Sequence, residues 1–223
     1  DDVSRLVEMY QDEPEMIGIG PEEISMDSME HLFWKIKPYQ KTEVSVKSVK
    51  RAGRSIIFCR TRRGVDRLGD EMQEMGVELS TLHGGLNQRQ RDRAMSKFVT
   101  GRSMVLIATD VAARGLDING VDLVIQTQPP AKNFSGRADT ETYVHRSGRT
   151  GRAGRSGTCI TLFTHVQEPL IQSIENAIGN KIKRIGTPQL EDLAKDDKLE
   201  IAAGRTLTPA EPTKGAIFIQ SFI

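Results

Sequence analysis

Four arginines spaced by three residues carry the clearest chemistry in this sequence: Arg146, Arg149, Arg152 and Arg155, with glycines and small residues between them. A guanidinium is permanently charged and forked, so it can bind phosphate oxygens and stabilise a phosphoryl group during its transfer. The intervening glycines let a phosphate or a partner backbone approach closely. Taken alone, the segment fits phosphoryl-transfer chemistry and a generic basic RNA-binding stretch equally well.

Polar, basic and glycine residues also follow three apolar runs farther upstream. They are Arg60 and Thr61, then Gly84 and Gly85 with Gln88 and Arg91 just beyond, and then Thr109 and Asp110 with Gly115 and Asp117 beyond. In open α/β sheets, ligands bind at the carboxyl ends of the strands. Glycine amides and arginines at such an edge are suited to phosphate oxygens. We therefore expect a phosphate-binding edge if these runs are parallel strands.

The periodicity supports that arrangement, because short apolar runs alternate with helical patterns. Strands are expected at His31–Ile36, Ser55–Cys59, Glu78–His83, Met104–Thr109, Leu123–Thr127 and Thr158–Phe163. Helices are expected at Tyr39–Lys50, Arg62–Met75, Asn87–Val99 and Gln167–Ile178. The predicted fold class is α/β: a doubly wound, mostly parallel sheet with helices on both faces.

The 223 residues suggest one domain with extensions. Residues 1–24 are acidic and are expected to form a helix and a linker, and the start at Asp1 without an initiator Met suggests a fragment of a longer polypeptide. Residues 25–186 are expected to form the α/β domain and residues 187–223 a C-terminal extension. The tail from 206 to 223 alternates apolar and polar residues, so it could add a strand to a sheet edge and allow self-association.

Composition excludes several classes of protein. The chain is 37% hydrophobic, which is enough for a core. The longest apolar run, Met104 to Ala108, is far shorter than the ~20 residues of a membrane span, so no membrane partner is expected. Cys59 and Cys159 both sit inside apolar runs, which predicts buried, reduced thiols and an intracellular, reducing compartment. No residue pattern predicts a metal site.

The net charge of +1 conceals a strong asymmetry. Residues 1–30 hold ten acidic residues and one base, which leaves 30 Lys and Arg against 20 Asp and Glu in residues 31–223. Lys50 to Arg67 contains seven bases and one acid, and His145 to Arg155 contains four arginines and no acid. Such clusters favour a phosphate-bearing partner, although a charge run by itself is more often a solvated face.

Four segments, in the expected order, resemble motifs of the DEAD-box RNA helicases over roughly residues 30–165. The run HRSGRTGR, from His145 to Arg152, resembles their motif VI, and TDVAARGLD, from Thr109 to Asp117, resembles motif V. Ser55–Cys59 resembles motif IV, and Gln88–Arg91 resembles the QxxR motif. The resemblance implies the second, C-terminal RecA-like domain of an ATP-dependent RNA helicase, with residues 1–24 as the acidic end of the preceding domain and the interdomain linker. Lys183–Pro188 (KRIGTP) further resembles nucleolar Gu-type helicases and their organellar relatives.

The resemblance also implies a role for each matching residue. Arg149 and Arg152 would be arginine fingers on the γ-phosphate of ATP, Asp117 with Gly115 would hold the nucleotide, and His145 and Arg146 would link this domain to the preceding RecA-like domain. The remaining matches would follow the RNA sugar–phosphate backbone without reading its sequence. They are Arg60, Thr61, Gly84, Gly85, Gln88, Arg91, Thr109 and Asp110.

The P-loop and the Asp-Glu-Ala-Asp sequence are absent from the 223 residues. The resemblance therefore places ATP between two domains, with Mg²⁺ held by the missing N-terminal RecA-like domain. The chain alone is expected to have negligible ATPase activity. The nucleus or nucleolus is the favoured location, with an organelle or the cytoplasm as alternatives.

Two departures from the family and two rival functions stay open. The segment Ala131–Thr142 is longer than usual, and Gly85 stands where many relatives carry an acidic residue. One rival is a related motor that acts on DNA or remodels protein–RNA complexes. The other is a non-catalytic interaction module that uses the 131–142 loop and the C-terminal tail. His31 and His165 are expected to be structural, and Trp34 is expected to pack in the core.

Overall fold

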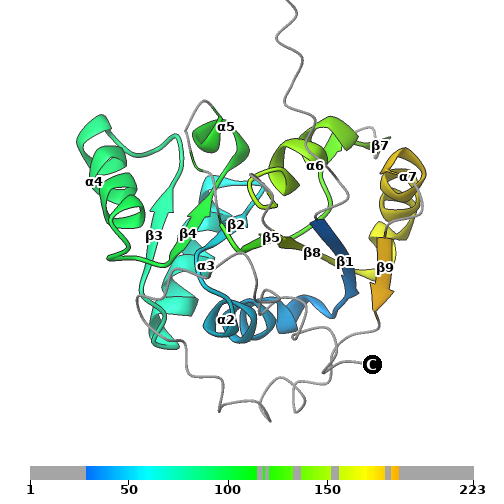
Figure 1. Cartoon of the computed structure of the whole chain (residues 1–223), viewed down its shortest axis with the longest axis horizontal. Coiled ribbons are helices and arrows are strands. Elements are labelled where there is room, and N and C mark those ends of the chain that lie inside the picture. Colours follow the sequence, from blue (N-terminus) through cyan, green and yellow to red (C-terminus); the bar gives the residue numbers. More distant parts are fainter. Residues whose placement is uncertain are drawn as a thin grey trace, which may run out of the picture.

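A computed structural model of the chain describes residues 29–114, 118, 121–132, 137–151, 156–178 and 182–185. Its main sheet has seven strands in the order β3-β4-β2-β5-β8-β1-β9, and every neighbouring pair is parallel (Figure 1). The strands are β1 (Met29–Lys35), β2 (Ser55–Phe58), β3 (Leu79–Leu82), β4 (Val105–Ala108), β5 (Leu123–Gln126), β8 (Gly157–Phe163) and β9 (Ile182–Ile185). The predicted α/β class is confirmed.

Helices connect these strands, as parallel pairing requires. They are α2 (Lys41–Arg51), α3 (Arg62–Glu74), α4 (Gln88–Val99), α5 (Asp110–Ala113), α6 (Thr140–Ser147) and α7 (Glu168–Ile178), with short 3-10 turns η2 (Pro38–Gln40) and η4 (His165–Gln167). The six predicted strands and four predicted helices are all present, with ends within two residues of those expected.

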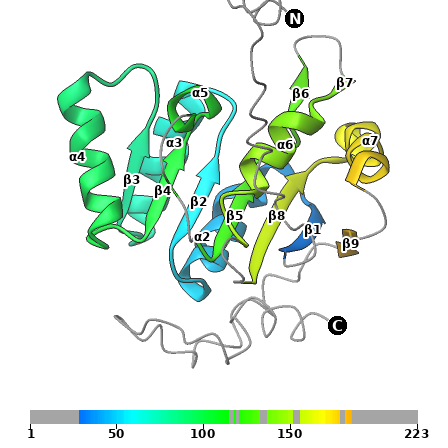
Figure 2. The same cartoon turned by 45° about the horizontal axis from the view of Figure 1, so that its top comes forward.

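The core lies on both faces of the sheet because successive residues of a strand point to opposite sides. Ile57 of β2 packs with residues of α2 and α3 on one face. Ile56 and Phe58 pack with residues of α4 and α5 on the other. On that second face, α6 and α7 cover the strands β1 and β8. In Figures 1 and 2, α4 flanks the β3 end of the sheet and α7 lies at the β9 end.

Beyond the predicted elements, the structure contains β9, a two-stranded hairpin and the helices α5 and α6. β9 adds a seventh strand beside β1 at one edge of the sheet. The polar segment after β5 contains a two-stranded hairpin, β6 (Ala131–Lys132) with β7 (Arg137–Ala138), and β7 lies against α7. The segment ends in α6, which begins where the side chain of Asp139 accepts a hydrogen bond from the Thr142 amide at 3.1 Å.

Expectations about single buried residues are confirmed. Trp34 is fully buried in the core beneath α2 and α3. Cys59 and Cys159 are buried and not disulfide-bonded. His31 is also buried, and its Nδ1 lies 2.8 Å from the hydroxyl of Tyr143, so it has a structural contact within the core.

The predictions for residues 1–24 and 187–223 lie outside the described residues. Within the part of the chain that the structure describes, no helix combines the length and apolarity that crossing a bilayer requires.

Candidate nucleic-acid and nucleotide interface

The register of the sheet brings three predicted loops to one edge. Phe58 at the end of β2 pairs with Ala108 at the end of β4, and Ala108 pairs in turn with Leu82 at the end of β3. The segments that follow these three strands therefore start side by side. Arg60, Thr61, Gly84, Gly85 and Gln88 are exposed there, Arg91 and Asp110 are partly exposed, and Thr109 is buried. Seven of the eight predicted RNA-binding residues are thus accessible on one carboxyl edge.

Side-chain caps fix where the helices begin at this edge. The Thr61 hydroxyl accepts a hydrogen bond from the Gly64 amide at 3.0 Å and starts α3. Asn87 and Gln90 form a reciprocal capping box at the start of α4, with both bonds at 2.9 Å. Arg60 and Gln88, which stand next to these caps, are consequently presented at defined positions beside the loops.

The His83-Gly84-Gly85 turn is held from inside the domain. His83 Nδ1 accepts a hydrogen bond from the Gly85 amide at 3.1 Å, so Nε2 carries the ring proton and donates it to Asp66 at 2.8 Å. The His83 side chain is only 9% exposed. A Cβ atom on Gly85 would lie 3.0 Å from Nδ1, which explains why glycine suits this turn in place of an acidic residue.

A bidentate ion pair connects two of the predicted motifs. Arg146 of α6 donates through Nε to one carboxylate oxygen of Asp110 at 2.6 Å and through Nη2 to the other at 2.7 Å. The side chain of Arg146 is 4% exposed and that of Asp110 is 27% exposed. Charge-assisted pairs of this geometry are strong and directional, so the start of α5 and the end of α6 are fixed relative to each other.

Further contacts satisfy the rest of the Arg146 guanidinium. Its Nη1 donates to the Gln126 side chain at 3.1 Å and to the Gln128 carbonyl at 3.4 Å, and its charge lies 5.6 Å from the centre of the Phe58 ring. Gln126 in turn donates to the sulfur of Cys159 at 3.5 Å. Burial raises the pKa of the Cys159 thiol to about 11, so this cysteine stays neutral near pH 7 and serves as a packing group.

Arg146 therefore has a contact that was not expected. The resemblance implied that Arg146 links this domain to the preceding one, and that link stays a prediction; within this domain the guanidinium is buried in an ion pair, because Asp110 and Gln126 offer acceptors close by. The arginine spacing also does not continue along a helix. α6 ends at Ser147, and Arg149 lies in a turn beyond it, with its amide donating to the Arg146 carbonyl at 3.2 Å.

The turn that carries Arg149 is tightly anchored. The buried hydroxyl of Thr150 donates to the Val121 carbonyl at 2.5 Å. Gly151 has a φ of 68°, a left-handed conformation that favours glycine. A Cβ on Gly157 would lie 2.0 Å from the Thr150 hydroxyl, so β8 must begin with a glycine for the turn to pack against it. The backbone that carries Arg149 is therefore held on both sides.

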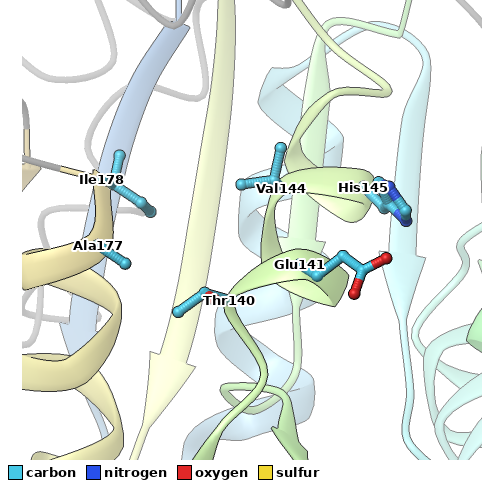
Figure 3. Close-up of a pocket in the computed structure, with 6 residues that line it drawn as sticks. All are labelled: Thr140, Glu141, Val144, His145, Ala177 and Ile178. Atoms are coloured by element: carbon cyan, nitrogen blue, oxygen red, sulfur yellow. The ribbon is translucent and has the colours of Figure 1, made fainter. Parts of the chain in front are cut away.

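The other residues predicted for the nucleotide site and the domain contact divide into two groups. Gly115, Asp117 and Arg152 lie outside the described residues. His145 is described and exposed, and it lines a shallow cleft between α6 and α7. Figure 3 shows Val144 turned toward Ala177 and Ile178 of α7, while His145 and Glu141 lie on the neighbouring face of α6. His145 is thus free of the core, unlike Arg146.

Sequence reasoning did not predict three residues that contact the candidate site from within the domain: Asp66, His83 and Gln126. His83 carried one signal, since it stands between an apolar run and two glycines. Asp66 and Gln126 carried none, because their partners are distant in sequence. Among the described residues, no group of three or more His, Cys, Asp or Glu side chains could hold a metal ion.

The comparisons with known proteins agree with this geometry. A family model described as "Helicase conserved C-terminal domain" matches residues 37–154. The solved C-terminal domain of the DEAD-box protein Dbp5 covers 78% of this chain and 98% of its own length, at 34% identity and a TM-score of 0.69. The chain belongs to the helicase C-terminal domains of the DEAD-box family. Its sheet and helices are therefore those of a RecA-like domain.

Two curated relatives of this helicase domain are ATP-dependent RNA helicase DbpA of Bacillus subtilis and Nucleolar RNA helicase 2 of Rattus norvegicus. The first is 35% identical over 196 residues, which is 87% of this chain and 40% of DbpA. The second is 38% identical over 169 residues, which is 76% of this chain and 20% of the rat protein. The chain thus spans well under half the length of these relatives.

One solved relative carries ligands. It is described as Saccharomyces cerevisiae Dbp5 bound to RNA and ADP BeF3, and it matches 78% of this chain and 44% of its own, at 34% identity and a TM-score of 0.69. The same fold therefore occurs in a protein that binds both RNA and a nucleotide.

Proposed function

We propose that this helicase domain is the second RecA-like domain of an ATP-dependent RNA helicase that locally unwinds RNA duplexes. In this proposal, the carboxyl edge of β2, β3 and β4 binds the RNA backbone, and Arg149 with Arg152 reaches the γ-phosphate of ATP. The preceding domain of the parent chain supplies the P-loop and holds Mg²⁺. His145, which is exposed on α6, contacts that preceding domain.

The ion pair between Asp110 and Arg146 carries this proposal. Asp110 begins the helix that follows β4 at the RNA-binding edge, and Arg146 lies three residues before Arg149. The two-point contact joins the loop that would hold RNA to the turn that would present an arginine finger. Because the turn is anchored again at Thr150, RNA binding and finger placement would depend on one rigid unit. Each ligand would then favour the closed arrangement that also binds the other, as linkage requires.

Residue chemistry supports the assigned roles. An arginine finger stabilises the charge that develops on the transferring phosphoryl group and is worth about 10³-fold or more in kcat in related systems. The candidate RNA contacts are cations, hydroxyls, amides and glycine backbone, which recognise phosphates and sugars without selecting a base sequence. We propose that the protein is located inside the cell, and among the intracellular compartments we propose the nucleolus first.

The deciding experiment measures ATP turnover by the full parent polypeptide with single-stranded RNA and with DNA of matched sequence. We expect RNA-dependent turnover that falls about 10³-fold in Arg149→Ala, with RNA affinity and melting temperature retained. Arg67→Ala is the matched control, because Arg67 is exposed and, among the described residues, its ion-pair partner is its helix neighbour Glu71 at 2.7 Å.

Three other outcomes would change the proposal. Equal stimulation by DNA would favour a related motor that acts on DNA. No turnover by the intact parent would favour a non-catalytic interaction module. Turnover by the isolated 223-residue chain would refute the proposal that the nucleotide site needs the preceding domain.

A further inference from the structure

Helix α4 carries a row of cations that the proposed function does not use. Arg89, Arg93 and Lys97 are spaced by four residues, so they lie along one face of the helix and form a basic stripe about 12 Å long. All three are exposed. The opposite face is the one that packs on the sheet, through the buried Phe98 and the partly buried Ala94 and Met95.

The stripe lacks counter-charges in the described part of the chain. Neither an ion pair nor a side-chain hydrogen bond joins Arg89, Arg93 or Lys97 to another described residue. The acidic neighbour on the helix, Asp92, accepts a hydrogen bond from Gln88 at 2.7 Å instead. Cations on α2 differ in this respect, since Lys47 pairs with Glu43 at 2.9 Å.

Uncompensated like charges at this spacing destabilise a helix. A row of them that is not needed for packing is typical of a surface that meets an anionic partner. The repeating positions, one per helical turn, match a partner whose negative charges also repeat along its length. The phosphates of a nucleic acid backbone have that property.

The stripe is continuous with the proposed RNA-binding edge. Arg89 directly follows Gln88, which is exposed at the carboxyl edge beside the His83 turn. From there α4 runs away from that edge along the β3 side of the sheet, at the outside of the molecule (Figures 1 and 2). We propose that the basic stripe is an auxiliary track for the backbone of the same RNA strand after it leaves the carboxyl edge. This inference rests on the proposed function.

The test compares two double variants that each remove two positive charges. Arg93→Gln with Lys97→Gln alters the stripe far from the edge. Lys37→Gln with Lys50→Gln is the control, because both residues are exposed and Lys50 lies on α2, on the other face of the sheet. Binding of the full chain to a short oligouridylate that fills only the edge, and to one three times as long, is measured between 50 and 200 mM salt.

We expect the stripe variant to bind the short oligonucleotide like the unaltered chain. For the long oligonucleotide, the Kd of the stripe variant should rise by up to about 25-fold at 0.1 M salt. The slope of log Kd against log salt concentration should fall by about 1.4, which is about 0.7 for each phosphate that the variant no longer neutralises. The control variant should change neither quantity.

Unchanged affinity of the stripe variant for the long RNA would overturn the inference. The stripe on α4 would then face an acidic protein surface or solvent. Equal reductions in affinity for short and long RNA would also overturn it, because the stripe would then act through the edge itself. Failure of the unaltered chain to bind either RNA would instead refute the proposed function.

Discussion

Replacing Asp110 with alanine should destabilise the domain strongly, because it leaves the Arg146 guanidinium buried without its counter-ion. The substitution removes two charge-assisted hydrogen bonds of 2.6 and 2.7 Å. Breaking a buried pair by removing one partner costs about 3–5 kcal/mol. We expect the lower end, about 3 kcal/mol, because Gln126 still accepts one bond and water can reach a site where Asp110 is 27% exposed.

Thermal and urea unfolding would measure this loss of stability. For a chain of this size, about 3 kcal/mol corresponds to a fall in Tm of about 6–12 °C. Asp70→Ala is the matched control, since Asp70 is an exposed aspartate on α3, and it should stay within about 0.5 kcal/mol of the unaltered chain.

A double variant measures the interaction energy between Asp110 and Arg146 separately from the contacts that each makes with other residues. Arg146→Met combined with Asp110→Ala removes both charges and should be less destabilised than the sum of the single variants, with a coupling of about 2–3 kcal/mol. The reasoning fails if Asp110→Ala loses no more stability than Asp70→Ala, or if the two single effects simply add.

Two further predictions concern buried histidines. Burial lowers the pKa of His31 to about 4, so the unfolded chain takes up a proton near pH 6.5 that the folded chain rejects. Lowering the pH from 7 to 4.5 should therefore reduce the free energy of unfolding by about 2.5 kcal/mol more in the unaltered chain than in His31→Gln, as measured by urea titrations at the two pH values. Asp66→Ala should release His83 and weaken binding of a short RNA about 3-fold or more, with a Tm change of less than about 4 °C; unchanged RNA affinity would show that this hydrogen bond does not order the loop.

Most of the fold could be predicted because each central strand is a short, continuous apolar run bounded by polar residues. Ile56, Ile57 and Phe58 point to both faces of the sheet, and both faces are covered, so the whole run had to be apolar. β9 has no such signal, since its sequence Ile-Lys-Arg-Ile is short and half charged. It forms a strand through pairing with β1, which is a tertiary effect.

The candidate site was predicted in part for a similar reason. Residues such as Arg60 and Gly84 follow apolar runs directly, so their place at the carboxyl edge followed from the strand predictions. The pairing of Asp110 with Arg146 spans 36 residues and depends on how α6 packs, which the local sequence does not encode. Gly115, Asp117 and Arg152 stay predictions.

The position of β1 within the sheet has a consequence for synthesis of the chain. Every residue of β1 pairs with a residue of β8 that lies 128 positions later. At about 5–20 residues per second, a ribosome needs about 6–26 s to make that stretch. During this interval Leu32, Phe33 and Trp34, all fully buried in the finished domain, lack the strand that covers their backbone. The first described strand therefore cannot complete its pairing in the sheet until β8 has been synthesised, and its apolar residues lack that cover in the meantime.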